Sequence, residues 1–187
     1  MANDLTLFAQ RLLKFDPAAL IRLRASQAWG QLPWGVLVTI DLPSAVEGDR
    51  VVTAADATPS DAKWRGTLPP AASSTVETLP AALVLNAAKA AAETLRELTG
   101  RAGERAIRDA LLDHEVITGE SDVDGTPFVV SQRLVQAMVR MGFVGSAEVE
   151  IRRAGPWTGL VTPAGQAWLR SASQLTVRPI VNHLNGR

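Results

Sequence analysis

The chain contains no cysteine and no tyrosine, and only two of its 187 residues are histidine. Without cysteine there can be no thiol nucleophile, no cysteine-ligated zinc or iron–sulfur centre and no disulfide. Lysine is scarce, because it accounts for only three of the 19 basic residues. Much of the usual catalytic inventory is therefore missing. The composition favours a non-catalytic protein over an enzyme, and it implies no cofactor.

The positive and negative charges cancel, with 19 residues of each sign and a formal net charge of +0. This balance argues against a protein built around long-range attraction to nucleic acid or an anionic membrane, although a local basic patch remains compatible with it. The many arginines and alanines are more typical of a GC-rich bacterial genome than of phosphate binding.

The hydrophobic content of 47% is typical of a folded chain, and 187 residues are enough for one full-sized core. The first residues show no secretory-signal pattern, and no uncharged stretch is long enough to span a bilayer. We therefore expect a cytoplasmic protein with no membrane partner and a single domain over residues 1–187.

Apolar residues recur at helical spacing in four segments, which predicts helices over 3–15, 81–99, 103–114 and 129–141. Pro80 precedes the second of these helices and Gly100 follows it, as is usual at helix ends.

Alternation of apolar and polar residues predicts strands in both terminal parts of the chain, namely 21–26, 34–42, 50–54, 147–151, 157–161, 166–170 and 175–180. Residues 27–31 are predicted to form a turn. Strands at both ends with helices between them predict an α+β fold. Its antiparallel sheet would be built from the N- and C-terminal strands, with three to four helices packed mainly on one face.

Residues 43–79 are rich in proline and serine and predict a long surface connection, which is uncommon inside a compact domain. Its composition does not distinguish a lid from a linker.

Two heptapeptides, residues 33–39 and 156–162, share five residues, including the Pro-Trp pair. This match predicts similar strands in similar environments at the two ends of the chain. It does not distinguish a true internal repeat from two strands that use the same residue types.

Two patterns suggest metal sites without completing one. Residues 120–125 place acidic side chains at positions 1, 3 and 5 of a calcium-type loop, but Ser131 stands where the bidentate glutamate belongs. A solvated acidic turn is the simpler interpretation. His114 and His183 show no ligand spacing, and so we predict no metal site.

Tryptophan is the residue that best suits a binding surface, because it is enriched at interface hot spots. We expect most of the five tryptophans to pack in the core, and Trp64 to be exposed within the proline-rich connection. Lys63 and Arg65 flank it and suit an acidic partner.

Residues 131–144 resemble the recognition helix of a winged-helix regulator of the multiple-antibiotic-resistance type, followed by the Gly-hydrophobic-Val strand of that family. Arginines at 152 and 153 stand where that family carries its wing, and residues 160–165 stand where its Leu-Thr-x-x-Gly helix start lies. The resemblance implies DNA binding, with contacts to base edges or phosphates from Ser131, Gln132, Arg133, Gln136, Arg152 and Arg153.

The function we favour from the sequence is non-catalytic binding or regulation of another macromolecule, most simply a protein, either a second copy or a different chain. The candidate binding residues are Lys63, Trp64, Arg65, Arg133, Gln136, Arg152 and Arg153. A winged-helix regulator using residues 131–165 is the second hypothesis. The third is a hydrolase based on Asp and Glu, or a small-ligand protein with a pocket under residues 55–79.

Overall fold

The structure is a computed structural model that describes residues 2–98, 104–121 and 124–171. Its helices are α1 (Ala2–Leu13), α2 (Ala81–Leu98), α3 (Glu104–Asp113) and α4 (Gln132–Arg140), with a short 3₁₀ helix, η1 (Asp61–Lys63). The first five strands are β1 (Leu20–Arg24), β2 (Gln27–Gln31), β3 (Leu37–Asp41), β4 (Asp49–Thr53) and β5 (Ser74–Leu79). The other five are β6 (Glu115–Glu120), β7 (Pro127–Ser131), β8 (Val149–Ala154), β9 (Trp157–Thr162) and β10 (Gly165–Arg170).

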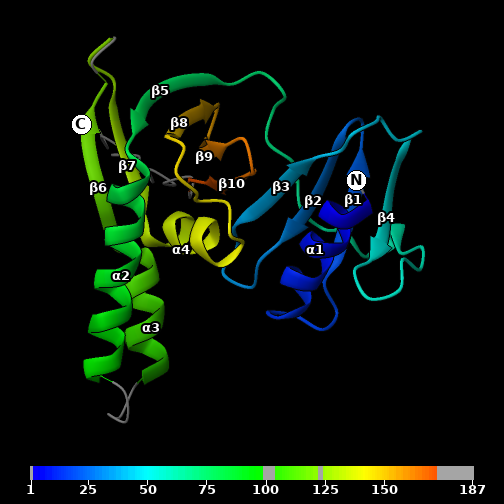
Figure 1. Ribbon diagram of the computed structural model, residues 1–187, viewed down its shortest axis with the longest axis horizontal. Helices are drawn as coiled ribbons and strands as arrows, with labels where there is room; N and C mark the ends of the chain where they lie inside the picture. The colour runs from blue at the N-terminus through cyan, green and yellow to red at the C-terminus, as the bar shows by residue number, and fades with distance from the viewer. Residues whose placement is uncertain (1, 99–103, 122–123, 172–187) are drawn as a thin grey trace, which may run out of the picture.

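Eight strands form one antiparallel sheet in the order β4-β1-β2-β3-β10-β9-β8-β5, and β6 and β7 form a separate hairpin (Figure 1). The predicted α+β class is confirmed. The N- and C-terminal strands meet where β3 pairs with β10, with Val38 opposite Ala167 and Leu37 opposite Trp168. The strand expected over 175–180 lies outside the described residues. None of the described helices is long and apolar enough to cross a membrane.

The prediction of a turn at residues 27–31 is wrong, because these residues form β2, an interior strand of the sheet. The chain reverses two residues earlier, at Ala25 and Ser26, and Ala25 takes the positive φ of 50° that such a tight turn requires. Alanine is not a usual residue for that conformation, and so the turn was missed. Gly30 of β2 allows α1 to approach, since a Cβ there would lie only 2.6 Å from the Leu12 Cδ1 atom.

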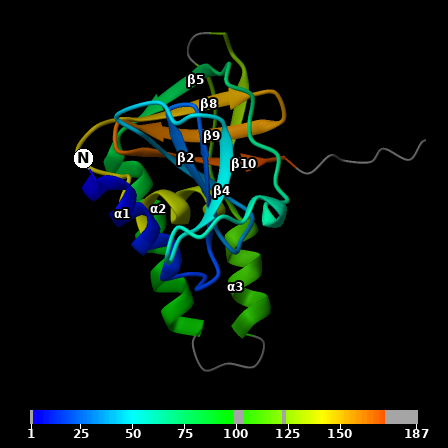
Figure 2. The same cartoon turned by 90° about the vertical axis from the view of Figure 1, so that its right-hand side faces the viewer.

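α1, α2 and α4 pack on one side of the sheet, as expected, and α3 packs against α2 and α4. The main core joins this face of the sheet to buried apolar residues of α1, α2 and α4, among them Phe8 and Leu12, Val84, and Leu134 and Met138. α2 and α3 run side by side and extend away from the sheet, as both views show (Figures 1 and 2).

The opposite face of the sheet carries a second, smaller core, which we call the tryptophan cluster. Its buried members are Trp29, Leu37, Ala154, Trp157, Val161 and Trp168, which come from β2, β3, β8, β9 and β10. Half-buried Trp64 and Leu68, from the segment between β4 and β5, pack against this cluster. The long connection therefore covers apolar sheet surface. Part of the range 43–79 is regular structure, because it contains β4, η1 and β5.

The two matching heptapeptides do not occupy similar strands. Residues 156–162 cover β9, whereas residues 33–36 form the turn before β3. Trp157 lies in the tryptophan cluster, but Trp34 packs on the helical side, where its ring meets Phe15 edge-on at a centroid distance of 5.4 Å. By position after the hairpin turn, the counterpart of Trp157 in the N-terminal meander is Gln27, because Arg24 pairs with Gln27 as Ala154 pairs with Trp157.

The β6–β7 hairpin was not predicted from the sequence. The acidic segment considered as a calcium loop forms its turn, where the Asp124 carboxylate accepts a hydrogen bond from the Thr126 N–H at 2.9 Å. Residues 122–123 lie outside the described part of the chain. Among the residues that are described, no group of three or more potential ligand side chains is placed to hold a metal ion.

Candidate functional site

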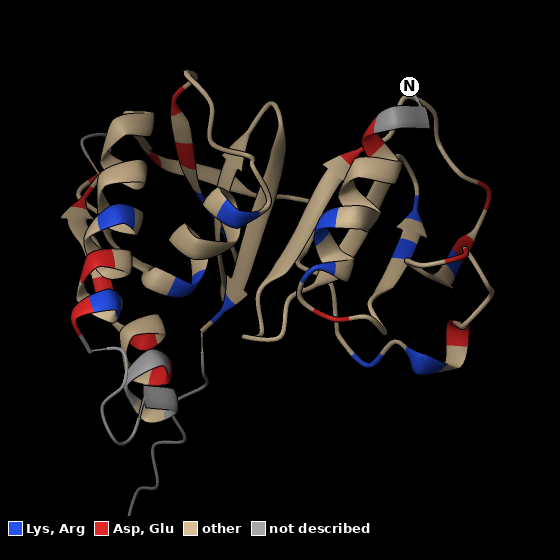
Figure 3. Cartoon of the chain, turned by 60° about the horizontal axis from the view of Figure 1, so that its bottom comes forward, with Lys and Arg blue, Asp and Glu red and all other residues tan. Residues whose placement is uncertain are grey.

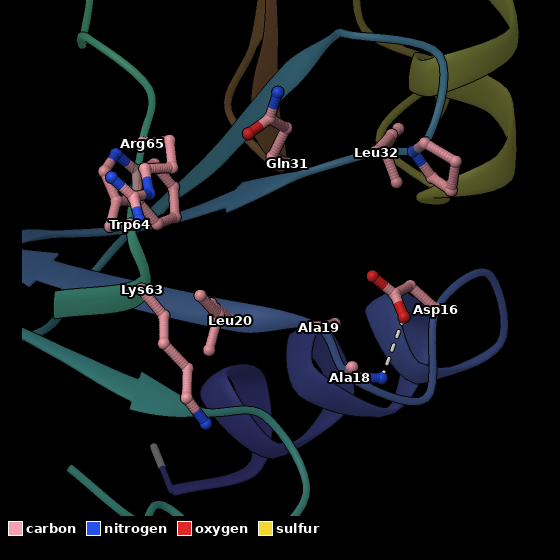
Figure 4. Close-up of a pocket in the computed structure, with 10 residues that line it drawn as sticks. Asp16, Ala18, Ala19, Leu20, Gln31, Leu32, Lys63, Trp64 and Arg65 are labelled. Carbon is pink, nitrogen blue, oxygen red and sulfur yellow. Dashed lines mark hydrogen bonds between the residues drawn. The ribbon is translucent and has the colours of Figure 1, made fainter. Parts of the chain in front are cut away.

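A pocket of about 280 Å³ lies where the α1–β1 loop, the end of β2 and the segment after η1 meet (Figure 4). We call it the basic pocket. Figure 4 shows Lys63, Trp64 and Arg65 on one side of it and Asp16 with Leu32 on the other. The sequence prediction of a binding segment at 63–65 thus falls on a hollow of the surface.

The segment that carries these residues is fixed to strand β4. The N–H of Val51 donates to the Asp61 carboxylate at 2.6 Å, and the N–H of Ser60 donates to the Val51 carbonyl at 2.8 Å. An isolated bridge between Val52 and Pro59 adds a further attachment. The backbone at the pocket is therefore held by the sheet, although the segment belongs to a connection rather than to a strand.

Trp64 is half-buried, which corrects the expectation that it would be exposed. Its indole N–H donates to the Gly66 carbonyl at 2.6 Å, and the Arg22 guanidinium lies 5.9 Å from the ring centroid. The ring packs against the tryptophan cluster. Trp64 thus anchors the segment while one part of its ring lines the pocket.

Lys63 and Arg65 are exposed, and neither forms an ion pair with any residue that the structure describes. The acidic residue of the pocket wall is Asp16, whose carboxylate accepts the N–H of Ala18 at 2.8 Å. The two cations are thus available to an incoming anion.

A second cavity of about 290 Å³ shares Gln31 and Arg65 with the basic pocket. It adds Trp157 and Arg170, and no carboxylate lines it. Gln31 and Arg170 were not predicted as site residues. They come together only because β3 pairs with β10, and no local sequence pattern signals that pairing.

The other predicted binding residues line neither the basic pocket nor the adjoining cavity. Arg133, on α4, donates from Nε to the Asp113 carboxylate at 2.6 Å and from Nη1 to the Trp34 carbonyl. The indole N–H of Trp34 donates back to the Arg133 carbonyl at 3.2 Å. This reciprocal contact holds the N-terminal end of α4 to the turn before β3.

Gln136 lies on the same helix, where its side-chain oxygen accepts a hydrogen bond from Arg140 at 3.1 Å. On β8, Arg152 pairs with Glu150 at 2.7 Å, and Arg153 donates to the Pro127 carbonyl at 2.9 Å. Because successive side chains of a strand point to opposite faces, Arg152 and Arg153 cannot act together on one phosphate backbone.

The winged-helix arrangement expected for residues 131–165 is wrong. α4 is not an exposed recognition helix, since its residues Gln132, Leu134, Val135, Ala137 and Met138 are buried under the sheet. The strands that follow it are β8, β9 and β10 of the large sheet rather than a two-stranded wing. Basic residues are scattered over both halves of the molecule rather than gathered on α4 (Figure 3).

Three arginine–carboxylate pairs predict how stability responds to acid. A hydrogen bond from Arg133 lowers the pKa of Asp113 below its ordinary value. Hydrogen bonds from Arg22 and Arg152 likewise lower the pKa values of Asp49 and Glu150, respectively. In all three cases partial desolvation of the carboxyl group opposes the shift but is the smaller effect. A carboxyl group whose pKa is lower in the folded protein than in the unfolded chain stabilises the fold at pH values above the unfolded-state pKa, which is about 4 for these groups. This stabilisation is lost as the pH falls through the folded-state pKa. Urea midpoints should therefore decrease between pH 5 and pH 3. The decrease should be smaller in Asp49→Asn/Asp113→Asn, and equal decreases in both proteins would contradict the assignment.

Acid–base chemistry has few suitable groups in the cavities. One cavity of about 390 Å³, beside α1, is lined by the two carboxylates of Asp4 and Asp41 together with Arg11. The Asp41 carboxylate accepts a hydrogen bond from Gln27 at 3.1 Å, and Arg11 donates to the Met141 carbonyl. By contrast, the basic pocket offers exposed cations beside an aromatic ring, which suits binding of an anion better than bond cleavage.

Two sequence families match the chain, and each covers more than half of it. A domain of unknown function (DUF8010) matches residues 1–105, and a second domain of unknown function (DUF8185) matches residues 68–174. No curated protein matches the chain.

Among solved structures, the DNA polymerase III beta subunit of Thermotoga maritima is similar over 89% of this chain, with 12% identity and a TM-score of 0.49. The similarity spans 61% of that protein's length. PCNA of Thermococcus kodakaraensis is similar over 90% of this chain and 95% of its own, with 13% identity and a TM-score of 0.41.

Proposed function

The chain belongs to both of these families, DUF8010 and DUF8185, and from its surface we propose that it is a non-catalytic protein that binds an acidic segment of another protein at the basic pocket. The observation that carries the proposal is the grouping of Lys63, Arg65 and Arg170 around two adjoining cavities, with no ion pair to any described residue.

The charges favour a carboxylate-bearing partner. A guanidinium can donate two parallel hydrogen bonds to one carboxylate, and such charge-assisted bonds are roughly twice as strong as neutral ones. Arg65 lines both cavities and is therefore placed to bind an acidic side chain in either of them. Lys63 and Arg170, at the two outer ends, suit acidic residues on each side.

The aromatic residues favour a protein segment over a free ion. Trp64 lines the basic pocket and Trp157 lines the adjoining cavity, so an incoming segment would bury apolar atoms as well as charge. Tryptophan and arginine are the residues most enriched at the energetic centres of protein interfaces. The volume of each cavity lies just below the usual range for small-molecule pockets, which is about 300–1,000 Å³. Each cavity therefore suits a single side chain of a partner protein.

The fixed backbone of the segment should help binding. Its hydrogen bonds to Val51 and the packing of Trp64 on the tryptophan cluster hold the pocket before any partner arrives. A binding surface that is already ordered loses less conformational entropy on association.

The test is fluorescence anisotropy with a fluorescein-labelled hexaglutamate peptide, compared with hexalysine, at 50 and 200 mM salt. Lys63→Gln/Arg65→Gln should weaken hexaglutamate binding about tenfold or more, which corresponds to about 1.4 kcal/mol. Lys14→Gln/Arg24→Gln removes the same charge from exposed positions outside the pocket, and its affinity should stay within about twofold of the parent.

Equal losses in the two double variants would show that only net charge matters and would overturn the proposal. So would tighter binding of a mixed-sequence DNA duplex that depends on Lys63 and Arg65, since the partner would then be nucleic acid. Absence of hexaglutamate binding at 50 mM salt would also count against it.

A further inference from the structure

Gln132, the first residue of α4, has a buried side chain that lacks partners. It is only 1% exposed, and no described residue hydrogen-bonds to its amide nitrogen or its amide oxygen. Its backbone N–H is satisfied, because it donates to the His114 carbonyl at 2.8 Å. The unpaired groups are therefore those of the side chain alone.

Such an arrangement is unusual. Buried polar side chains nearly always have a hydrogen-bond partner, and each unsatisfied group destabilises the fold. The amide of glutamine has two N–H donors and an oxygen acceptor, and a leucine would fill similar space without that loss. A bound molecule that supplies both a hydrogen-bond acceptor and a donor would satisfy the amide nitrogen and the amide oxygen of Gln132.

Two cavities adjoin at Gln132, between α2, α3 and α4. The larger, about 630 Å³, and the smaller, about 320 Å³, are both lined by Ala91, Leu111 and Gln132. Alanines of α2 keep this space open, because a longer side chain there would fill it. Both volumes lie within the range of small-molecule sites, about 300–1,000 Å³.

The two cavities differ in their charged groups. The smaller one is lined by Arg96 and Arg140 and by no carboxylate, together with apolar residues that include Trp34 and Leu95. The larger one is lined mainly by apolar residues, among them Ala87, Ala90 and Val116, with His114 and Glu115 at its polar part.

We propose that the helical side of the protein binds a small amphipathic molecule of the N-acyl amino acid class, with Gln132 as its central contact. The acyl chain occupies the larger cavity, the secondary amide pairs with the donor and the acceptor of Gln132, and the carboxylate lies in the smaller cavity with Arg96 and Arg140. This site is separate from the basic pocket and does not depend on the function proposed for it.

Isothermal titration calorimetry with N-octanoylglycine tests the proposal. The parent protein should bind this probe, and Gln132→Leu should weaken binding at least about tenfold. The methyl ester of N-octanoylglycine, which lacks the carboxylate, should bind at least about fivefold more weakly than the acid. Ala91→Leu should weaken binding, because its three extra carbons enter the space where the two cavities adjoin, whereas Ala82→Leu, at an exposed position of α2, should leave it unchanged.

Stability without the probe provides a second readout. Because Gln132→Leu removes two unsatisfied groups, its urea midpoint should be higher than that of the parent when no ligand is present. A lower midpoint would show that Gln132 has a structural partner and would overturn the proposal. Absence of binding to the parent protein, or equal binding by Gln132→Leu, would overturn it as well.

The two proposed sites can fail independently. Lys63→Gln/Arg65→Gln should retain binding of N-octanoylglycine, and Gln132→Leu should retain binding of hexaglutamate. A loss of both ligands in either variant would indicate a damaged fold, and circular dichroism of each variant identifies that case.

Discussion

Replacing Gly159 with alanine should lower the free energy of unfolding by about 1–3 kcal/mol, the usual cost of overpacking a core. Gly159 lies on β9 directly opposite Trp168 of β10, and an added Cβ would lie 2.5, 2.6 and 2.7 Å from three atoms of the indole. The indole is only 4% exposed and packs with Trp29 and Trp157, so it has no free space into which to move. Urea unfolding followed by circular dichroism measures the loss.

Gly145 provides a matched control, because a Cβ at that position would meet no atom within 4 Å. Gly145→Ala should be neutral or slightly stabilising, by up to about 1 kcal/mol. In a Trp168→Leu background the obstacle is removed, and Gly159→Ala should then cost little. A cost that is the same in both backgrounds would show that the strand, not the indole, demands glycine.

Replacing Arg133 with methionine should lower the free energy of unfolding by about 1–3 kcal/mol, chiefly because the part-buried Trp34 carbonyl loses its charged donor; the Asp113 side chain is 64% exposed, and so its ion pair adds little. The change removes the donors to the Asp113 carboxylate and to the Trp34 carbonyl while keeping an apolar stem of similar length. The Trp34 carbonyl lies at the attachment of α4 to the turn before β3. The same urea experiment measures this effect, with the slope of the transition as a check that unfolding stays two-state.

Arg24→Met is the control for this prediction. Arg24 is also an arginine near a carboxylate, but its side chain is 58% exposed and lies 3.7 Å from Asp49. Exposed ion pairs contribute about 0–1 kcal/mol, and so this variant should lie close to the parent. Equal effects of the two variants would show that the contacts of Arg133 are no stronger than those of a surface arginine.

The helices were the most predictable part of the fold. The expected range 81–99 corresponds to α2 (Ala81–Leu98), and 129–141 contains α4 (Gln132–Arg140), although residues 129–131 belong to strand β7 instead. A helix forms its hydrogen bonds within one segment, and its buried stripe repeats with a fixed period, so a short stretch of sequence contains the signal.

Strands β2, β5, β6 and β7 were missed because their signals are not local. β2 contains glutamines, glycine and alanine, which favour a turn when considered alone. It is a strand because it lies between β1 and β3 and carries Trp29 into the tryptophan cluster. Strand propensity depends on cross-strand neighbours, and these neighbours are distant in the sequence.

The residues of the candidate sites also divide into those with a local signal in the sequence and those without one. Lys63, Trp64 and Arg65 are adjacent in the sequence, and their composition indicated a binding segment that the structure places at a pocket. Arg170 joins that region only through the pairing of β3 with β10. Gln132 was expected to contact base edges, but the structure buries it between helices and cavities. A helical period alone does not show which polar residue of α4 faces the interior.

The pairing of β3 with β10 also has a consequence for synthesis of the protein. During translation, β3 is made early, and its partner on one side, β10, is made more than 120 residues later. Until then that edge of β3 has unpaired N–H and C=O groups beside Leu37, which can pair with the strands of other chains. The sheet is therefore completed late, by a contact of high sequence separation, and such contacts slow folding. The chain passes through an interval of exposure to aggregation that lasts until its final meander is made.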